Sequence, residues 1–152
     1  MPMPVEIVRP GAGKKYPAGR LKRVAARLLK LLKKDKAELS VALIGNAEMR
    51  KLNARYRNKN YPTDVLSFPA AQDMPEGVRL LGDVIISVDK AKEQARERGR
   101  SLDEEMTTLL IHGVLHLLGY DHERSVKDAR IMGRLEEKLY RELCDLRRLQ
   151  VY

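Results

Sequence analysis

The order of apolar and polar residues divides the chain into stretches with two different periods. Alternation with a period of two predicts a short strand at 5–8, and runs of β-favouring residues predict further strands at 39–45, 65–68 and 81–87. Between the first two strands, apolar residues spaced by three and four predict an amphipathic helix over 21–32, with lysine and arginine on its outer face. We expect Asn46 to be the N-cap of a second helix, which runs through Tyr56.

The helices of the C-terminal half carry clear signals at their ends. Either Ser87 or Asp89 is expected to cap a charged helix, which Gly99 ends. Ser101 and Glu104 have the spacing of a capping box, in which the side chain of each residue accepts a hydrogen bond from the backbone N–H of the other. This box predicts the start of a long apolar helix.

A last helix is expected to begin after Ser125. Strands therefore mix with helices in the first part of the chain, and helices follow one another in the second. This order predicts an α+β fold, in which a small mixed β-sheet packs against several α-helices. A length of 152 residues is typical of one domain, so we expect a single domain over residues 1–152.

The chain is strongly basic, with 30 Lys and Arg against 21 Asp and Glu and a formal net charge of +9. This excess favours a polyanionic partner, with nucleic acid ahead of an anionic membrane surface, although a merely soluble basic protein agrees with the charge equally well. Cys144 has no second cysteine to pair with, the first residues lack the pattern of a signal peptide, and no apolar run is long enough to span a membrane. We therefore expect a cytoplasmic protein without a membrane partner.

The chain has three histidines, His112, His116 and His122, close together in the sequence. Helical residues four apart project from the same face, so the first two imidazoles can close on one metal ion. Gly119 can adopt the positive φ that ends the helix and turns the third histidine back. A lone histidine among leucines is more often a hydrogen-bonded core residue, but three at this spacing favour a zinc-type site with an open fourth position.

The residue after the first histidine is Gly113, where metalloproteases with the pattern H-E-x-x-H have the glutamate that acts as general base. A peptidase would therefore lack its base at the expected place. A metal ion can still polarise a phosphoryl oxygen or activate water, so hydrolysis of a phosphodiester stays open. The candidate proton acceptors are Asp121, Glu123 or a carboxylate from elsewhere in the chain.

Three segments resemble the YbeY family of metal-dependent endoribonucleases: L-N-A-R-Y-R-N-K-N-Y-P-T-D-V-L-S-F-P, L-G-D-V-I-I-S and H-G-V-L-H-L-L-G-Y-D-H. The resemblance implies cleavage of single-stranded RNA, maturation of the 3′ end of 16S ribosomal RNA, ribosome quality control, and a Zn²⁺ ion as the cofactor. It also implies roles in activity for Arg57, in the first segment, and for Asp83, in the second. Ribosomal RNA and the small ribosomal subunit are then the expected partners.

The planar fork of donors on Arg57 is suited to holding the scissile phosphate, whereas Asp83 is as consistent with a strand-end residue as with a catalytic one. With no Trp, one Phe and six Tyr, phosphate contacts are expected to outweigh base stacking, so RNA affinity should fall steeply with salt. Two alternatives remain: a metallohydrolase of another substrate, such as a peptide, and a ribosome-associated factor whose structural zinc is closed by a carboxylate such as Asp121. The sequence does not identify the attacking oxygen, the cleavage position or the oligomeric state. It does not identify the metal either, and Ni²⁺ is another candidate.

Overall fold

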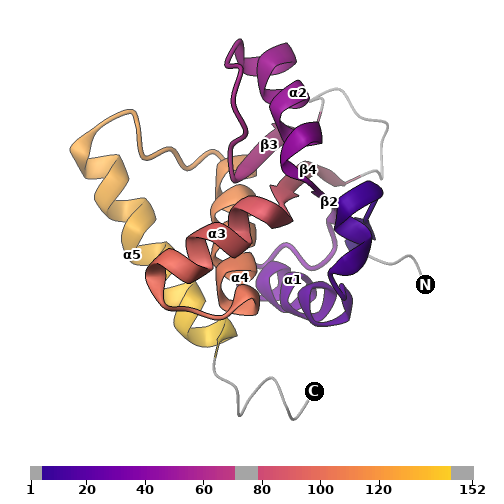
Figure 1. Ribbon diagram of the computed structural model, residues 1–152. Coiled ribbons are helices and arrows are strands. Elements are labelled where there is room, and N and C mark those ends of the chain that lie inside the picture. The colour runs from indigo at the N-terminus through magenta and orange to yellow at the C-terminus, as the bar shows by residue number, and fades with distance from the viewer. Residues whose placement is uncertain (1–4, 71–78, 145–152) are drawn as a thin grey trace.

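The structure, a computed structural model, describes residues 5–70 and 79–144 (Figure 1). In chain order its elements are β1 (Val5–Val8), a short 3₁₀-helix (Gly11–Lys15), α1 (Gly19–Leu31), β2 (Glu38–Ile44), α2 (Asn46–Arg57), β3 (Val65–Pro69), β4 (Leu80–Ser87), α3 (Val88–Arg98), α4 (Leu102–Leu117) and α5 (Val126–Leu143). The strands of these ranges form one sheet in the order β1-β2-β4-β3, in which β1, β2 and β4 are parallel and β3 is an antiparallel edge strand. The predicted α+β class, with a small mixed sheet against several helices, is confirmed.

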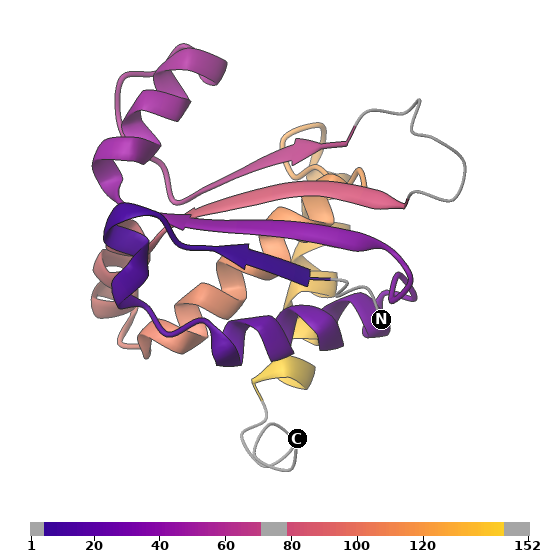
Figure 2. The same cartoon turned by 90° about the vertical axis from the view of Figure 1, so that its right-hand side faces the viewer.

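The two faces of the sheet are covered unequally (Figure 2). Val84 and Ile86 of β4 are fully buried in the main core, on the face where α1, α4 and α5 lie. On the opposite face α2 packs against one end of the sheet, where its Met49 joins Ile44 and Leu66 in a second, smaller cluster. The edge strand β3 therefore lies between α4 on one face of the sheet and α2 on the other.

The helix α4 runs through the core and contacts β3, β4, α1, α3 and α5. Its first turn is held by the predicted capping box, because both of the hydrogen bonds between Ser101 and Glu104 are present. Further along, the fully buried carboxylate of Glu105 pairs with Arg98 and Arg100, at N–O distances of 2.7 and 3.4 Å. The helix that carries the side chains of the last turns is therefore fixed at its start and packed along its length.

The helix α1 has the two faces that the sequence pattern predicts. Leu21, Leu28 and Leu29 have no exposed surface, whereas Arg23 and Lys30 are exposed. Burial of the apolar stripe holds the helix against the sheet and leaves the basic side chains in water. Within the ranges that the structure describes, no helix has both the length and the apolar run needed to cross a membrane.

The prediction that Asn46 is an N-cap is wrong by one residue, because Gly45 occupies that position and Asn46 is the first residue of α2. The backbone N–H of Asn46 donates instead to Oδ2 of Asp89, at 2.9 Å. Its side-chain oxygen accepts from the hydroxyl of Ser87, which is also the N-cap of α3 and accepts from the N–H of Lys90. The starts of α2 and α3 therefore satisfy each other's polar groups across the chain.

Candidate functional site

The three histidines come together as the sequence spacing predicts. His112 and His116 project from the last turns of α4, and His122 follows the end of that helix. One ring nitrogen from each lies within 4.8 Å of the other two, and the Nε2 atoms of His112 and His116 are 3.1 Å apart. The first two side chains are partly buried and the third is exposed.

The turn after α4 brings the third histidine back toward the first two. Gly119 has a φ of +97°, its N–H donates to the carbonyl of His116, and the N–H of Tyr120 donates to that of Leu115. This pair of bonds is a Schellman motif, which needs a residue with positive φ at the position of the glycine. The predicted role of Gly119 is confirmed, and it explains how His122 reaches the cluster.

The donor set fits a divalent metal ion. In a tetrahedral site with metal–nitrogen distances near 2.0–2.1 Å, two ligand nitrogens lie about 3.3 Å apart, close to the distance found for His112 and His116. Among the described residues the group of convergent donors consists of three imidazoles and includes no carboxylate. Imidazoles bind Zn²⁺ and also several other transition metals, so the donor set alone does not identify the metal ion.

The surroundings of His112 and His116 shift their pKa values in opposite directions. Burial, and then the neighbouring imidazoles of His112 and His122, lower the pKa of His116, which favours the neutral ring that binds metal. A hydrogen bond to the carboxylate of Glu136, 2.8 Å from Nδ1, raises the pKa of His112. A ring that donates from Nδ1 keeps Nε2 available, and that nitrogen faces His116.

The cluster opens into a cavity of about 690 Å³, called here the histidine cavity. Its wall is formed by the end of α2, the segment leading into β3, β3 itself and the chain after α4. The lining residues are Tyr56, Arg57, Thr63, Asp64, Val65, Leu66, Ser67, Phe68, Pro69, His112, His116, Asp121, His122 and Glu123. Arg57 and the two candidate proton acceptors, Asp121 and Glu123, are thus brought to the histidines.

Asp83 does not line the histidine cavity. It lies on β4, in register with Ser40 of β2 and Phe68 of β3, and it is exposed. Because its neighbour Val84 faces α4, Asp83 projects from the other face of the sheet. Its predicted role in activity stays a prediction, and its position separates it from the three imidazoles.

Gly113 is needed for packing at the position where metalloproteases have their base. A Cβ atom built there would lie 2.6 Å from Cγ1 of Val84 and 3.2 Å from Oγ of Ser67. The Ser67 hydroxyl also donates to the Gly113 carbonyl, at 2.8 Å. The position after the first histidine therefore faces the sheet, and it has no room for a glutamate.

The sequence analysis missed several residues of the site. Tyr56 and Phe68 line the cavity with their rings in edge-to-face contact, at a centroid distance of 5.2 Å. Asp64 lines it as well and raises the pKa of His112 through its charge. Glu136 comes from α5, where a carboxylate on the apolar stripe of an amphipathic helix is a signal that a partner must be present.

Comparison with known proteins places the chain in a family. The sequence model of the family described as Endoribonuclease YbeY matches residues 12–144, which include all three histidines. The Endoribonuclease YbeY of Sulfurihydrogenibium sp. (strain YO3AOP1) is 47% identical over 127 residues, which cover 83% of this chain and 84% of that protein. That of Aquifex aeolicus is 47% identical over 124 residues, which cover 82% of this chain and 77% of that protein.

A solved structure agrees with this result. The solution structure of TM1509 from Thermotoga maritima is similar to this one with a TM-score of 0.66 and a sequence identity of 32%, and the match covers 95% of this chain and 91% of that chain. The family model and the relatives therefore cover most of the chain, including the segment with the histidine cluster, and the similar solved structure extends over nearly all of it. The chain belongs to the YbeY family of endoribonucleases.

Proposed function

We propose that this protein is a metal-dependent, single-strand-specific endoribonuclease with Zn²⁺ at the three histidines. The observation that carries the proposal is the convergence of three imidazole nitrogens at the wall of a cavity that also contains Arg57. The donors leave a coordination position that the described side chains do not fill, which suits a catalytic site better than a structural one.

Different residues of the cavity would serve different steps of phosphodiester hydrolysis. A divalent ion at the histidines would supply Lewis-acid polarisation of a phosphoryl oxygen and activation of water. The guanidinium of Arg57 would bind two oxygens of the scissile phosphate and stabilise the charge that develops there. Asp121 or Glu123, which line the same cavity, would accept the proton released in the reaction.

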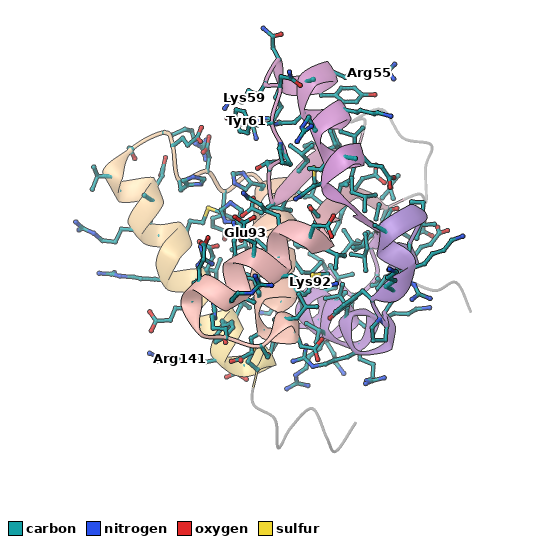
Figure 3. All side chains as sticks on the ribbon, in the orientation of Figure 1. Arg55, Lys59, Tyr61, Lys92, Glu93 and Arg141 are labelled. Atoms are coloured by element: carbon teal, nitrogen blue, oxygen red, sulfur yellow. The ribbon has the colours of Figure 1, made fainter. Side chains whose placement is uncertain are left out.

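Side chains at the end of α2 and just after it are the argument for a single-stranded substrate. Arg55, Lys59 and Tyr61 project there, away from the body of the molecule (Figure 3). Tyr56 is 55% exposed, its ring contacts Phe68, and the guanidinium of Arg55 lies over the ring at 5.3 Å from its centroid, so a base that stacks there would take the place of this arginine. Bases of a single strand can stack on such a ring, whereas the paired bases of a duplex cannot. Stacking therefore adds to the phosphate contacts.

The biological substrate we propose is the 3′ end of 16S ribosomal RNA, with a further role in ribosome quality control and the small ribosomal subunit as partner, in the cytoplasm. The support is the family to which the chain belongs, together with its net charge of +9, which attracts a polyanion.

The test uses protein purified without a histidine tag, analysed for metal content and then stripped and reloaded with Zn²⁺. We expect about one metal per chain, and cleavage of single-stranded RNA by the reloaded protein but not by the stripped one. A duplex of the same sequence should be cut much more slowly, and casein should stay intact. Equal cleavage by stripped and loaded protein would contradict the proposal, and digestion of casein would favour a peptidase.

A further inference from the structure

The helix α5 brings one carboxylate to the histidine cluster from outside the cavity. Glu136 lies on the core-facing side of α5, four residues after the fully buried Met132 and three before the buried Leu139. Its Oε2 atom is 2.8 Å from Nδ1 of His112, and each of the two side chains is 27% exposed. A carboxylate at such a position needs a partner to offset its loss of water, and here the partner is a candidate metal ligand.

The contact determines which nitrogen of His112 is free. An ionised carboxylate only accepts hydrogen bonds, so the Nδ1 atom that faces it must carry the proton. In a neutral imidazole, Nε2 then holds the lone pair. That nitrogen is 3.1 Å from Nε2 of His116, inside the group of convergent donors. The lone pair of His112 is thus directed to the place where a metal ion would bind.

We propose that Glu136 is a positioning residue, which holds His112 in the tautomer and orientation that bind a metal ion and thereby connects α5 to the metal centre. The inference rests on the proposed function, because it requires that the histidines bind metal. A hydrogen-bonded carboxylate makes a ligand imidazole more basic, and loss of such a partner typically weakens metal binding about 10–100-fold.

The same contact is one of the polar connections between α5 and α4. The Tyr140 hydroxyl donates to Oε2 of Glu104 at the start of α4, and Glu136 accepts from His112 near its end. Only the second of these connections involves a candidate ligand. Metal binding fixes His112 in place, so it strengthens the attachment of α5 at this point.

Glu137 provides a matched control, because it has the same side chain at the next position of the same helix. Its carboxylate pairs with Arg141 and is 61% exposed. The two residues differ in what they contact and not in charge or in helix propensity. A comparison of Glu136→Ala with Glu137→Ala therefore separates the effect of the contact with His112 from the effect of losing a charge on α5.

The first experiment measures the Kd for Zn²⁺ by competition with a chromogenic chelator. We expect Glu136→Ala to raise Kd about 10–100-fold and Glu137→Ala to leave it unchanged. Glu136→Gln should fall between them, because its amide oxygen can still accept from Nδ1 but carries no charge. The melting temperature of each metal-free variant checks the fold, and the isosteric Glu136→Gln serves if the alanine variant unfolds.

The second experiment records amide hydrogen exchange in α5 with and without Zn²⁺. Wild type and Glu137→Ala should gain protection around residue 136 when the metal is added, and Glu136→Ala should gain little. A Kd for Glu136→Ala equal to that of the wild type, or the same gain of protection in both, would overturn the inference. If wild-type protein does not bind Zn²⁺ at all, the proposed function fails, and that result is distinct from either of these.

Discussion

The helix α4 and the C-terminal end of α2 contribute to the same cavity in opposite ways. α4 brings two partly buried histidines, on a helix that contacts the sheet and three other helices. α2 brings Tyr56 and Arg57 from a helix of which only Met49 and Asn53 are buried. The side with the histidines therefore depends on packing, whereas the side proposed to bind RNA depends on exposed side chains with fewer constraints. Substitutions on α4 should change metal binding and stability. Substitutions on α2 should change RNA cleavage and RNA affinity.

The largest effect is expected on the α4 side. His116→Ala removes one of three ligands, so bound metal should fall to background and cleavage should be lost with it. Lewis-acid stabilisation is worth several kcal/mol, which corresponds to a loss of about 10³-fold or more in rate. Metal analysis and a cleavage assay on the same sample measure both. Full activity in a metal-free variant would show that the histidines are not the catalytic centre.

On the α2 side, Arg57→Ala should slow cleavage about 10²–10³-fold, because a donor to the developing charge on the phosphate is removed. The metal content should stay at the wild-type level. Arg57→Lys retains the charge without the planar fork and should recover only part of the rate.

The matched control for this substitution is Arg50→Ala. Arg50 is an exposed arginine on the same helix that does not line the histidine cavity. It should affect the rate much less, and single-turnover kinetics with a short single-stranded RNA distinguish the two. Loss of metal from Arg57→Ala would mean that Arg57 supports the metal centre, and the contrast between the two sides of the cavity would then break down.

A smaller effect is expected at Tyr56, whose ring is proposed to carry a base. Tyr56→Ala should weaken binding of single-stranded RNA by about 1–3 kcal/mol, while Tyr56→Phe should bind nearly as well as the wild type. The slope of affinity against salt should not change, because no phosphate contact is lost. A changed slope with unchanged affinity at low salt would point to an electrostatic role for this part of the cavity instead.

The smallest effect is expected on the free energy of unfolding, when each of two helical glycines is replaced by alanine. Gly113→Ala forces a methyl group against Val84 at a cost of about 1–3 kcal/mol, part of which is offset by the better helix propensity of alanine, worth about 1 kcal/mol. Gly133 of α5 has no atom within 4 Å of an added Cβ, so Gly133→Ala should stabilise the protein by about 1 kcal/mol. Urea unfolding of the metal-free proteins measures both. Equal stability of the two variants would show that close packing at Gly113 matters little.

The histidine cluster is predictable from sequence because its parts are close together in the chain. The four-residue spacing of His112 and His116 needs only helix geometry, and Gly119 needs only the local chemistry of a helix end. The capping box of Ser101 and Glu104 is local in the same sense. Arg57, by contrast, is suggested only by the family resemblance, because nothing in its own surroundings in sequence distinguishes it from other exposed arginines.

The remaining parts of the site depend on tertiary contacts that no local pattern contains. Glu136 and Tyr56 reach the cavity region from two helices on opposite faces of the sheet. The position of Asp83 depends on which face of β4 meets α4, and the neighbouring apolar residues of that strand do not show this. Asn46 is of a residue type that favours the N-cap, but its backbone N–H donates to the carboxylate of Asp89 on α3, and Gly45 is the N-cap. A partner distant in sequence thus overrides the local preference.

The four described strands all precede α4 in the chain, and His122 and α5 follow that helix. Protein synthesis starts at the N-terminus, and folding during synthesis proceeds in the same direction. A nascent chain therefore has its strands before it has the three imidazoles, and Glu136 is added later still. The histidine cluster is therefore completed on strands that have already been synthesised.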